Sequence, residues 1–349
     1  MRCVALAEEF ARLNFSIVFI MDRPSKTIFK VLSKRSFKLE CLTHRGEKAI
    51  RLCTPSISES WGAPVQDADA NATNNVLKRS SKDDLLFLDH YSCDAVWTQT
   101  INFKGRVVVI DDLANRQQVC DFLIDQNPSR LPSEYDHLVN KDAIVLTGSR
   151  YTIIREQILK RQSQSWSHTQ KSTAKEKLLI SFGGADPQNW TQRTLDILVE
   201  VTTALNLDIT VILGPVNPLT ESDLKISKDH RSRVSVLKNP PNYADLLTEH
   251  LLVVGACGSA CWEYLYLGIP SILLPTASNQ MANLATLVNS QAAFVIKPQE
   301  DFEERLNGIL NHALAHRKSL VELSKSAKRI VDGQGARRIV KKIMASKHV

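Results

Sequence analysis

Short apolar runs alternate with helical patterns along the chain, and this alternation restricts the fold more than any other feature of the sequence. Such runs, bounded by turn signals, are typical of strands buried on both faces of a parallel sheet. Strands are predicted at residues 16–21, 37–42, 85–88, 107–110, 122–124, 178–182, 209–213, 234–237, 251–254 and 271–274. Helices are predicted at residues 4–13, 67–78, 189–204, 243–249, 260–267 and from 280 onward. The pattern predicts a doubly wound α/β fold.

A polar segment at residues 162–176 separates two sets of these alternating elements. It is rich in Ser and Thr, as interdomain linkers often are. The chain has 349 residues, more than one hydrophobic core usually serves, so two domains are expected. The sequence therefore predicts a Rossmann-like domain at residues 1–161, a linker at 162–176, and a second Rossmann-like domain at 177–349, facing each other across a cleft.

Three predicted strands of the first domain end directly before an aspartate, at Asp89, Asp111 and Asp125. The carboxyl ends of parallel strands meet at the edge of the sheet where ligands bind, so these carboxylates are candidate ligand contacts. An Asp after a strand also caps a helix or a turn. The residues alone leave both interpretations open.

Glycines follow the first strand of the second domain, in the motif Ser181-Phe182-Gly183-Gly184-Ala185-Asp186-Pro187. Gly183 and Gly184 allow a ligand to approach the backbone closely, and Asp186 with Pro187 suits the first positions of a helix. Phosphate binding at the helix N-terminus and a bare tight turn both remain open. The motif is neither a Walker loop nor a spaced-glycine dinucleotide fingerprint.

A second glycine motif, Gly255-Ala256-Cys257-Gly258-Ser259-Ala260-Cys261-Trp262-Glu263, also follows a strand and opens a helix. Backbone N–H groups at such a helix start face an anion, and Ser259 suits the N-cap. Glu263 lies one turn further, where its carboxylate could accept hydrogen bonds from ribose hydroxyls. The alternative is a Glu on a solvated helix face. Asn279 and Gln280 follow the next strand and place two amides on the same edge of the sheet.

Several classes of protein are disfavoured by the cysteines and charges. The seven cysteines are scattered without any Cys-x-x-Cys pair, and Cys257 and Cys261 have no His or Asp nearby in the sequence, so disulfides and metal are not expected. No apolar run approaches the roughly 18 residues of a membrane span. Glu8 and Glu9 interrupt any signal peptide, which predicts a cytoplasmic protein. The net charge of +7 is modest and basic residues gather only near the C-terminus, so no nucleic acid is expected as a partner.

Further motifs, taken with these two, resemble a known family. They are Met1-Arg2-Cys3 with Ala5-Leu6-Ala7-Glu8-Glu9, Asp89-His90-Tyr91, Ile110-Asp111-Asp112-Leu113-Ala114, Asp125-Gln126-Asn127, and Gly148-Ser149-Arg150-Tyr151 with Arg155. In this order, and over nearly the whole chain, they resemble the UDP-2,4-diacetamido-2,4,6-trideoxy-β-L-altropyranose hydrolase family of pseudaminic acid biosynthesis.

The resemblance implies a GT-B fold, similar to that of the glycosyltransferase that adds GlcNAc to lipid intermediates in peptidoglycan synthesis. It implies release of UDP from a UDP-sugar with inversion at the anomeric carbon, without a metal or another cofactor. Glu263 would hold the ribose, the two glycine loops the diphosphate, and Asn279-Gln280 the sugar or phosphate side of the cleft. The candidate substrate-binding residues are Asp89, Asn127, Tyr151, Arg155, Gly183, Gly184, Gly258, Ser259, Glu263, Asn279 and Gln280.

The sequence departs from the family at its start. Members begin with a strand and a glycine-rich loop ending in Gly-His-Val, whose His is taken as the general base, whereas this sequence starts at the Met that follows. The first domain is therefore expected to lack its first strand, and the activity of this chain is in doubt. His90 is the alternative acid–base candidate, although a His after a strand is more often structural.

Two other functions remain open from the sequence. A glycosyltransferase of the same fold would bind the same UDP-sugar and pass the sugar to a hydroxyl acceptor instead of water. A non-catalytic protein that binds nucleotide sugars is the second alternative, because the family His is absent. The sequence gives no indication of the oligomeric state.

Overall fold

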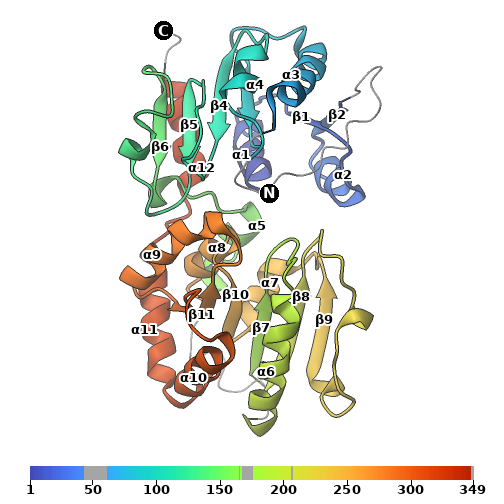
Figure 1. Ribbon diagram of the computed structural model, residues 1–349, viewed down its shortest axis with the longest axis vertical. Coiled ribbons are helices and arrows are strands. Elements are labelled where there is room, and N and C mark those ends of the chain that lie inside the picture. The colour runs from blue at the N-terminus through green and yellow to red at the C-terminus, as the bar shows by residue number, and fades with distance from the viewer. Residues whose placement is uncertain (43–60, 165, 167–175, 206, 347–349) are drawn as a thin grey trace. The chain divides into compact units, whose positions relative to one another are not determined.

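The computed structural model describes residues 1–42, 61–164, 166, 176–205 and 207–346 (Figure 1). The chain divides into two compact units, Met1–Ile153 with Gln334–Val349, and Ile154–Gly333. Each unit is built around parallel strands with helices on the faces of its larger sheet, so the predicted α/β class is confirmed.

In the described part of the first unit, the strands form two separate parallel sheets. Strands β1 and β2 pair with each other, and the larger sheet has the order β3-β4-β5-β6. The bounds are α1 (Arg2–Ala11), β1 (Val18–Met21), α2 (Lys26–Ser33), β2 (Lys38–Cys41), α3 (Ala63–Leu77), β3 (Leu85–Leu88), α4 (Ala95–Thr100), β4 (Arg106–Ile110), β5 (Phe122–Asp125), η1 (Pro132–Tyr135), β6 (Ile144–Thr147), η2 (Ser149–Tyr151) and α12 (Gly335–Ala345). The expectation that this domain lacks a strand stays a prediction.

Both faces of the larger sheet of the first unit are buried. On β4, Val108 and Ile110 face a core formed with α1 and α12, while Val109 faces a second core formed with α3 and α4. Strand β5 repeats this alternation, with Phe122 in the first core and Leu123 in the second. Side chains of a strand point alternately to its two faces, which explains why these runs are apolar without interruption.

The residues described in the second unit form one parallel sheet of six strands in the order β12-β11-β10-β7-β8-β9. The bounds are α5 (Glu156–Leu159), η3 (Gln162–Gln164), β7 (Lys177–Ser181), α6 (Trp190–Leu205), β8 (Asp208–Leu213), η5 (Glu221–Asp223), η6 (Arg231–Arg233), β9 (Val234–Lys238), α7 (Tyr243–Glu249), β10 (Leu252–Ala256), α8 (Ala260–Tyr266), β11 (Ser271–Leu274), η7 (Ser278–Gln280), α9 (Met281–Asn289), β12 (Phe294–Val295), α10 (Phe302–Ala315) and α11 (Arg317–Ala327). All ten predicted strands coincide with observed ones to within two residues at each end.

The structural division of the chain differs from the predicted domain limits in two places. Residues 154–161 join the second unit, because Ile154 and Ile158 are buried in its core. Residues 334–349 join the first unit, because Ile339 and Ile343 of α12 are buried against α1 and the larger sheet. Most of the predicted linker at 162–176 lies outside the described residues. Within it, Trp166 is buried in the second unit and its indole N–H donates to the carbonyl of Leu251 at 3.1 Å.

Candidate functional site

The carboxyl edge of the six-stranded sheet contains the point where the strand order reverses. From β7 the chain proceeds to β8 and β9 on one side, and from β10 it proceeds to β11 and β12 on the other. The loops after β7 and β10 therefore diverge, although the two strands are paired, with Gly255 opposite Ser181. Ligands of open α/β sheets bind at such a switch point, outside the carboxyl ends of the strands. Both glycine motifs predicted from the sequence lie there.

At two positions on this edge, neighbouring backbone atoms lie so close that only glycine fits. A Cβ atom on Gly255 would lie 2.4 Å from the carbonyl oxygen of Ser181, and one on Gly214 would lie 2.1 Å from that of Gly183. Gly183 has a φ angle of +79°, which few other residues adopt easily. Gly184 has open surroundings, with Val216 as the nearest neighbour of a Cβ at 3.6 Å. The loop after β7 therefore packs against Gly214 and Val216 of the loop after β8, and the Cβ position of Gly183 itself has no atom within 4 Å.

Helix α6 begins at Trp190, one residue after the predicted start at 189. Asp186 and Pro187 were expected at the N-cap and the first helical position; the capping role of Asp186 is confirmed, whereas Pro187 precedes the helix. The Asp186 carboxylate reaches forward and accepts hydrogen bonds from the backbone N–H groups of Trp190 and Thr191, both at 2.9 Å. It thus caps the helix and satisfies its first donors. A phosphate at this helix N-terminus would meet that carboxylate, so the glycine turn is the better anion contact of this loop.

Glu263 is buried, not exposed on a solvated helix face. It lies on α8 with 5% exposure, and its two carboxylate oxygens accept hydrogen bonds from Nε and Nη2 of Arg155, at 2.6 and 2.5 Å. The guanidinium also stacks over Tyr243, 4.8 Å from the ring centroid. Burial lowers the pKa of Arg155, but the charge of Glu263 and its hydrogen bonds outweigh burial and raise it overall. The ion pair fixes the orientation of the carboxylate.

The turn that carries Asn279 and Gln280 is connected to the second glycine motif. Gln280 accepts a hydrogen bond from the backbone N–H of Thr276 at 2.9 Å, and its Nε2 would lie 3.5 Å from a Cβ atom on Gly258. Asn283 of α9 donates to the carbonyl of Cys257 at 2.7 Å. Ser259 stands at the N-cap position of α8, but its side chain makes no capping hydrogen bond to that helix. The predicted residues of the loops after β10 and β11 therefore lie together.

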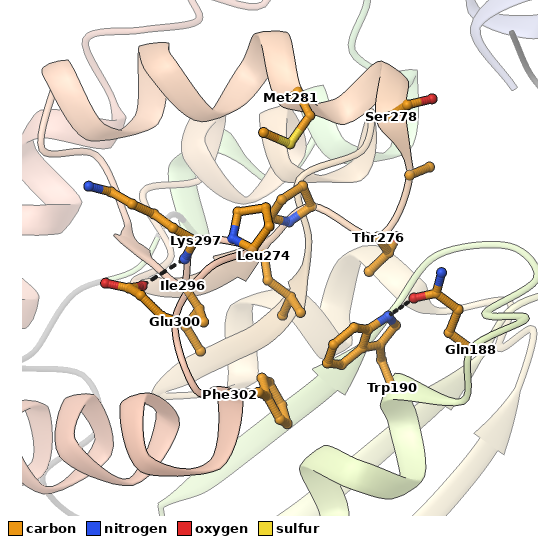
Figure 2. A pocket seen from close by; sticks show the side chains of 13 residues that line it. Gln188, Trp190, Leu274, Thr276, Ser278, Met281, Ile296, Lys297, Glu300 and Phe302 are labelled. Atoms are coloured by element: carbon orange, nitrogen blue, oxygen red, sulfur yellow. Dashed lines mark hydrogen bonds between the residues drawn. The ribbon is translucent and has the colours of Figure 1, made fainter.

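A pocket of about 330 Å³ adjoins this turn. Figure 2 shows Met281 on one side of it and the rings of Trp190 and Phe302 on the other. Its remaining walls come from the ends of β11 and β12 and the loops that follow them, which include Thr276 and Lys297. Sequence reasoning did not single out these residues. The sequence feature that could have identified them is their position directly after predicted strands or at the start of predicted helices.

In the first unit, Asp89 lies after β3 and is engaged within the unit. Its carboxylate pairs with Arg2 of α1, with Nη2 at 2.7 Å from Oδ1, and lies 2.9 Å from Sγ of Cys3. Burial raises the pKa of Asp89, but Arg2 lowers it further, and the net pKa is below its ordinary value. Arg2 also contacts Asp112 at 3.0 Å, and Tyr91 donates to the same carboxylate at 3.0 Å.

The other strand-end aspartates of the first unit organise turns. Asp111 accepts hydrogen bonds from the backbone N–H groups of Leu113 and Ala114 at 3.4 and 3.1 Å. Asp125 accepts one from the N–H of Asn127 at 2.9 Å and one from Arg130 Nε at 2.6 Å. These contacts match the capping interpretation that the sequence left open beside ligand binding.

The other candidate residues of the first unit, Asn127, Tyr151 and His90, also make contacts within that unit. The Asn127 amide donates to the carbonyl of Asp112 at 3.3 Å, and Tyr151 packs against the core that includes α12. The His90 ring lies 4.5 Å from that of Trp61, and its Nδ1 accepts the backbone N–H of Ser92 at 3.2 Å. Burial lowers the pKa of His90. The His is thus packed within the first unit, and its role in catalysis stays a prediction.

Among the described residues, no group of three or more His, Cys, Asp or Glu side chains could hold a metal ion. Cys257 and Cys261 are buried in the apolar core of the second unit, where burial raises the pKa of Cys257 to about 12. A thiol held in its protonated form is a poor metal ligand. No helix within the described ranges is long and apolar enough to cross a membrane.

Comparison with known proteins identifies relatives over parts of the chain. Residues 178–343 match the glycosyltransferase family 28 C-terminal domain. An uncharacterised protein of Methanocaldococcus jannaschii is 28% identical over 200 residues, which cover 50% of this chain and 41% of that protein. A UDP-N-acetylglucosamine--N-acetylmuramyl-(pentapeptide) pyrophosphoryl-undecaprenol N-acetylglucosamine transferase of Pediococcus pentosaceus is 29% identical over 160 residues, covering 44% of this chain and 43% of the transferase. These matches span less than half the length of either relative.

Solved structures resemble nearly the whole chain in fold. The crystal structure of Acinetobacter baumannii MurG has a TM-score of 0.64 at 14% identity, covering 99% of this chain and 95% of MurG. A UDP-N-acetylglucosamine 2-epimerase has a TM-score of 0.62 at 12% identity, covering 98% of this chain and 91% of the epimerase. The chain has the GT-B fold of two Rossmann-like domains, as predicted.

Proposed function

We propose that the protein is a GT-B enzyme that binds a UDP-sugar and transfers the sugar to an acceptor. The observation that carries the proposal is the position of both glycine loops at the switch point of the second unit, within the residues that match the family 28 C-terminal domain. Relatives and structural neighbours named for UDP-N-acetylglucosamine chemistry support a UDP-sugar as the ligand.

In this proposal the backbone N–H groups at Gly183-Gly184 and at Gly258-Ser259 bind the diphosphate, where the loops diverge. Gln280, beside Gly258, faces the sugar or the phosphate, with Asn279 next to it. Asp89, Asn127 and Tyr151 of the first unit stay candidate substrate contacts that rest on the family resemblance alone. Nothing in this assignment requires a metal or another cofactor.

Glu263 is proposed to bind the ribose hydroxyls while it remains paired with Arg155. An ionised carboxylate has about four lone-pair sites, and the bidentate guanidinium occupies two of them. The other two suit the vicinal 2′ and 3′ hydroxyls of a ribose. Arg155 then acts by holding the carboxylate in one orientation, which lowers the entropic cost of binding.

The family resemblance favours hydrolysis, in which water takes the place of the acceptor. Both reactions break the same bond between the anomeric carbon and the diphosphate, so nucleotide recognition is common to them. The comparisons support a glycosyltransferase-type enzyme, and the hydrolase and the diacetamido sugar remain proposals from the sequence motifs.

Product analysis separates these functions. The full chain is titrated with UDP and incubated with UDP-N-acetylglucosamine, with and without a panel of hydroxyl acceptors, and products are resolved by mass spectrometry. Transfer predicts UDP and a glycosylated acceptor, formed only when acceptor is present. UDP with free sugar in both samples would establish hydrolysis, and binding without UDP release would indicate a nucleotide-sugar binding protein. Absence of UDP binding would contradict the proposal as a whole.

A further inference from the structure

Two histidines lie one helical turn apart where α10 meets α11 (Figure 1). His312 lies in the last turn of α10, and His316 follows that helix directly and precedes Arg317, the first residue of α11. Side chains four residues apart lie on one face of a helix. The two imidazole rings stack with centroids 4.8 Å apart and planes 11° apart, and both residues are exposed. Two nitrogen ligands are therefore held side by side in contact with solvent.

A hydrogen bond of the His316 ring determines which of its nitrogens carries a proton. Nδ1 of His316 lies 3.2 Å from the backbone carbonyl oxygen of His312. A carbonyl oxygen only accepts, so Nδ1 is the donor, and in the neutral ring the free lone pair is on Nε2. A ring N–H that donates to a backbone carbonyl is the arrangement that orients metal-binding histidines. Nε2 of His316 is thus the nitrogen available to an ion.

The surroundings of the pair suit a cation. Phe294 of β12 meets the His312 ring edge to face, with centroids 6.2 Å apart, which limits the orientations of that ring. The carbonyl groups of the last helical turn give the end of α10 a partial negative charge. Arg317 forms an ion pair with Glu176 at 2.6 Å, so its positive charge is partly compensated.

We propose that His312 and His316 form a two-histidine site for a divalent transition metal, with Zn²⁺ as the representative ion. The same spacing of four residues places two zinc-binding histidines on one helix face in known motifs. Rotation about the Cβ–Cγ bonds, a torsion with a broad minimum, turns both lone pairs toward one ion. The pair supplies two of the four ligands of a tetrahedral zinc, and water supplies the others. The bound ion joins the end of α10 to the start of α11.

Calorimetric titration of the full chain with Zn²⁺, and separately with Mg²⁺, tests this site. Imidazole suits Zn²⁺, whereas Mg²⁺ prefers oxygen ligands, so the wild type is expected to bind Zn²⁺ here and not Mg²⁺. His312→Gln and His316→Gln each remove one ligand and should weaken this Zn²⁺ binding at least about 10-fold, the smallest loss usual when even a group supporting a metal ligand is removed. His137→Gln is the matched control and keeps the wild-type affinity, because His137 is exposed in the first unit and has no other histidine within four residues.

Hydrogen exchange locates the bound ion. Zn²⁺ should slow exchange in residues 312–320 of the wild type and of His137→Gln, but not of the two site variants. Circular dichroism without metal checks that all variants fold, as expected for substitutions of exposed side chains. Zn²⁺ binding that is absent from the wild type, or that is equal in the wild type and both site variants, overturns this inference. Neither result involves UDP, so the proposed function is tested separately.

Discussion

The ion pair between the buried Glu263 carboxylate and Arg155 should make the stability of the second unit sensitive to removal of the Glu263 side chain. Glu263→Ala would leave the Arg155 guanidinium, itself less than a quarter exposed, without its counter-charge. Removing one partner of a buried pair costs 3–5 kcal/mol in general, and partial exposure of Arg155 reduces this to about 2–3 kcal/mol. We therefore expect Glu263→Ala to lower the free energy of unfolding by that amount, measured by denaturant titration.

The exposed pair of Glu322 and Lys325 provides the control, and Glu322→Ala should change stability by less than about 0.5 kcal/mol. Glu263→Gln keeps an oxygen for Arg155 and suits a binding assay. If Glu263 holds the ribose, this variant weakens UDP binding by about 1.5–3 kcal/mol. Equal stability of Glu263→Ala and Glu322→Ala would show that the ion pair contributes little.

Asp125 should make the first unit less stable as pH rises. Burial raises its pKa to about 6, although the N–H of Asn127, Arg130 and Tyr135 act to lower it. The unfolded value is about 3.9, so the fold favours the protonated form. This stability is complete below about pH 4 and is lost as pH rises through about 6.

The measurement compares wild type and Asp125→Asn by denaturant unfolding at about pH 4 and pH 7.5. Asn cannot ionise, so the wild type should lose about 2–2.5 kcal/mol relative to the variant between these pH values. Asp142→Asn, at an exposed position of the same unit, controls for the general effect of pH. Parallel pH curves for wild type and Asp125→Asn would refute this assignment.

At the scale of elements, the pairing of β7 with β10 depends on Gly255. A methyl group there would lie 2.4 Å from the carbonyl oxygen of Ser181 and would push the strands apart at the switch point. Gly255→Ala should therefore destabilise the second unit by about 1–3 kcal/mol, as overpacking generally does.

Gly308 on α10 provides the opposite case, because nothing lies within 4 Å of its Cβ position. Gly308→Ala should raise stability by about 0.5–1 kcal/mol through helix propensity. Thermal unfolding of both variants tests whether Gly255→Ala lowers the stability and Gly308→Ala raises it. A destabilised Gly308→Ala, or a neutral Gly255→Ala, would contradict the contacts described.

At the scale of the whole molecule, the last helix belongs to the first unit. Ile343 of α12 is fully buried beside α1, whereas the adjacent Met344 is exposed. Ile343→Ala should cost about 2–5 kcal/mol, and Met344→Ala should cost less than about 0.5 kcal/mol. Hydrogen exchange identifies the unit affected: faster exchange is expected in β4 and β5 for Ile343→Ala only. Loss of protection in β7 and β10 instead would assign the helix to the other unit.

Some helices and strands were not predicted from the sequence, and there are physical reasons for this. Strand β6 and helix α4 are short, and α4 contains the β-branched residues Val96, Thr98 and Thr100, which disfavour helices in isolation. The helix forms because Asp94 caps it, with Oδ1 2.9 Å from the N–H of Val96, and because Trp97 is buried. Its stability comes from packing, which a local pattern does not contain.

The order of apolar and polar residues along the chain determined the α/β class, the positions of the ten predicted strands and the glycine loops at their ends. These features depend on local periodicity and on the conformational freedom of glycine. Only the tertiary structure decided that Arg155 pairs with Glu263, 108 residues away, and that α12 completes the first unit. Such contacts depend on how distant elements pack, and side chains far apart in sequence carry no local signal of which partner they will meet.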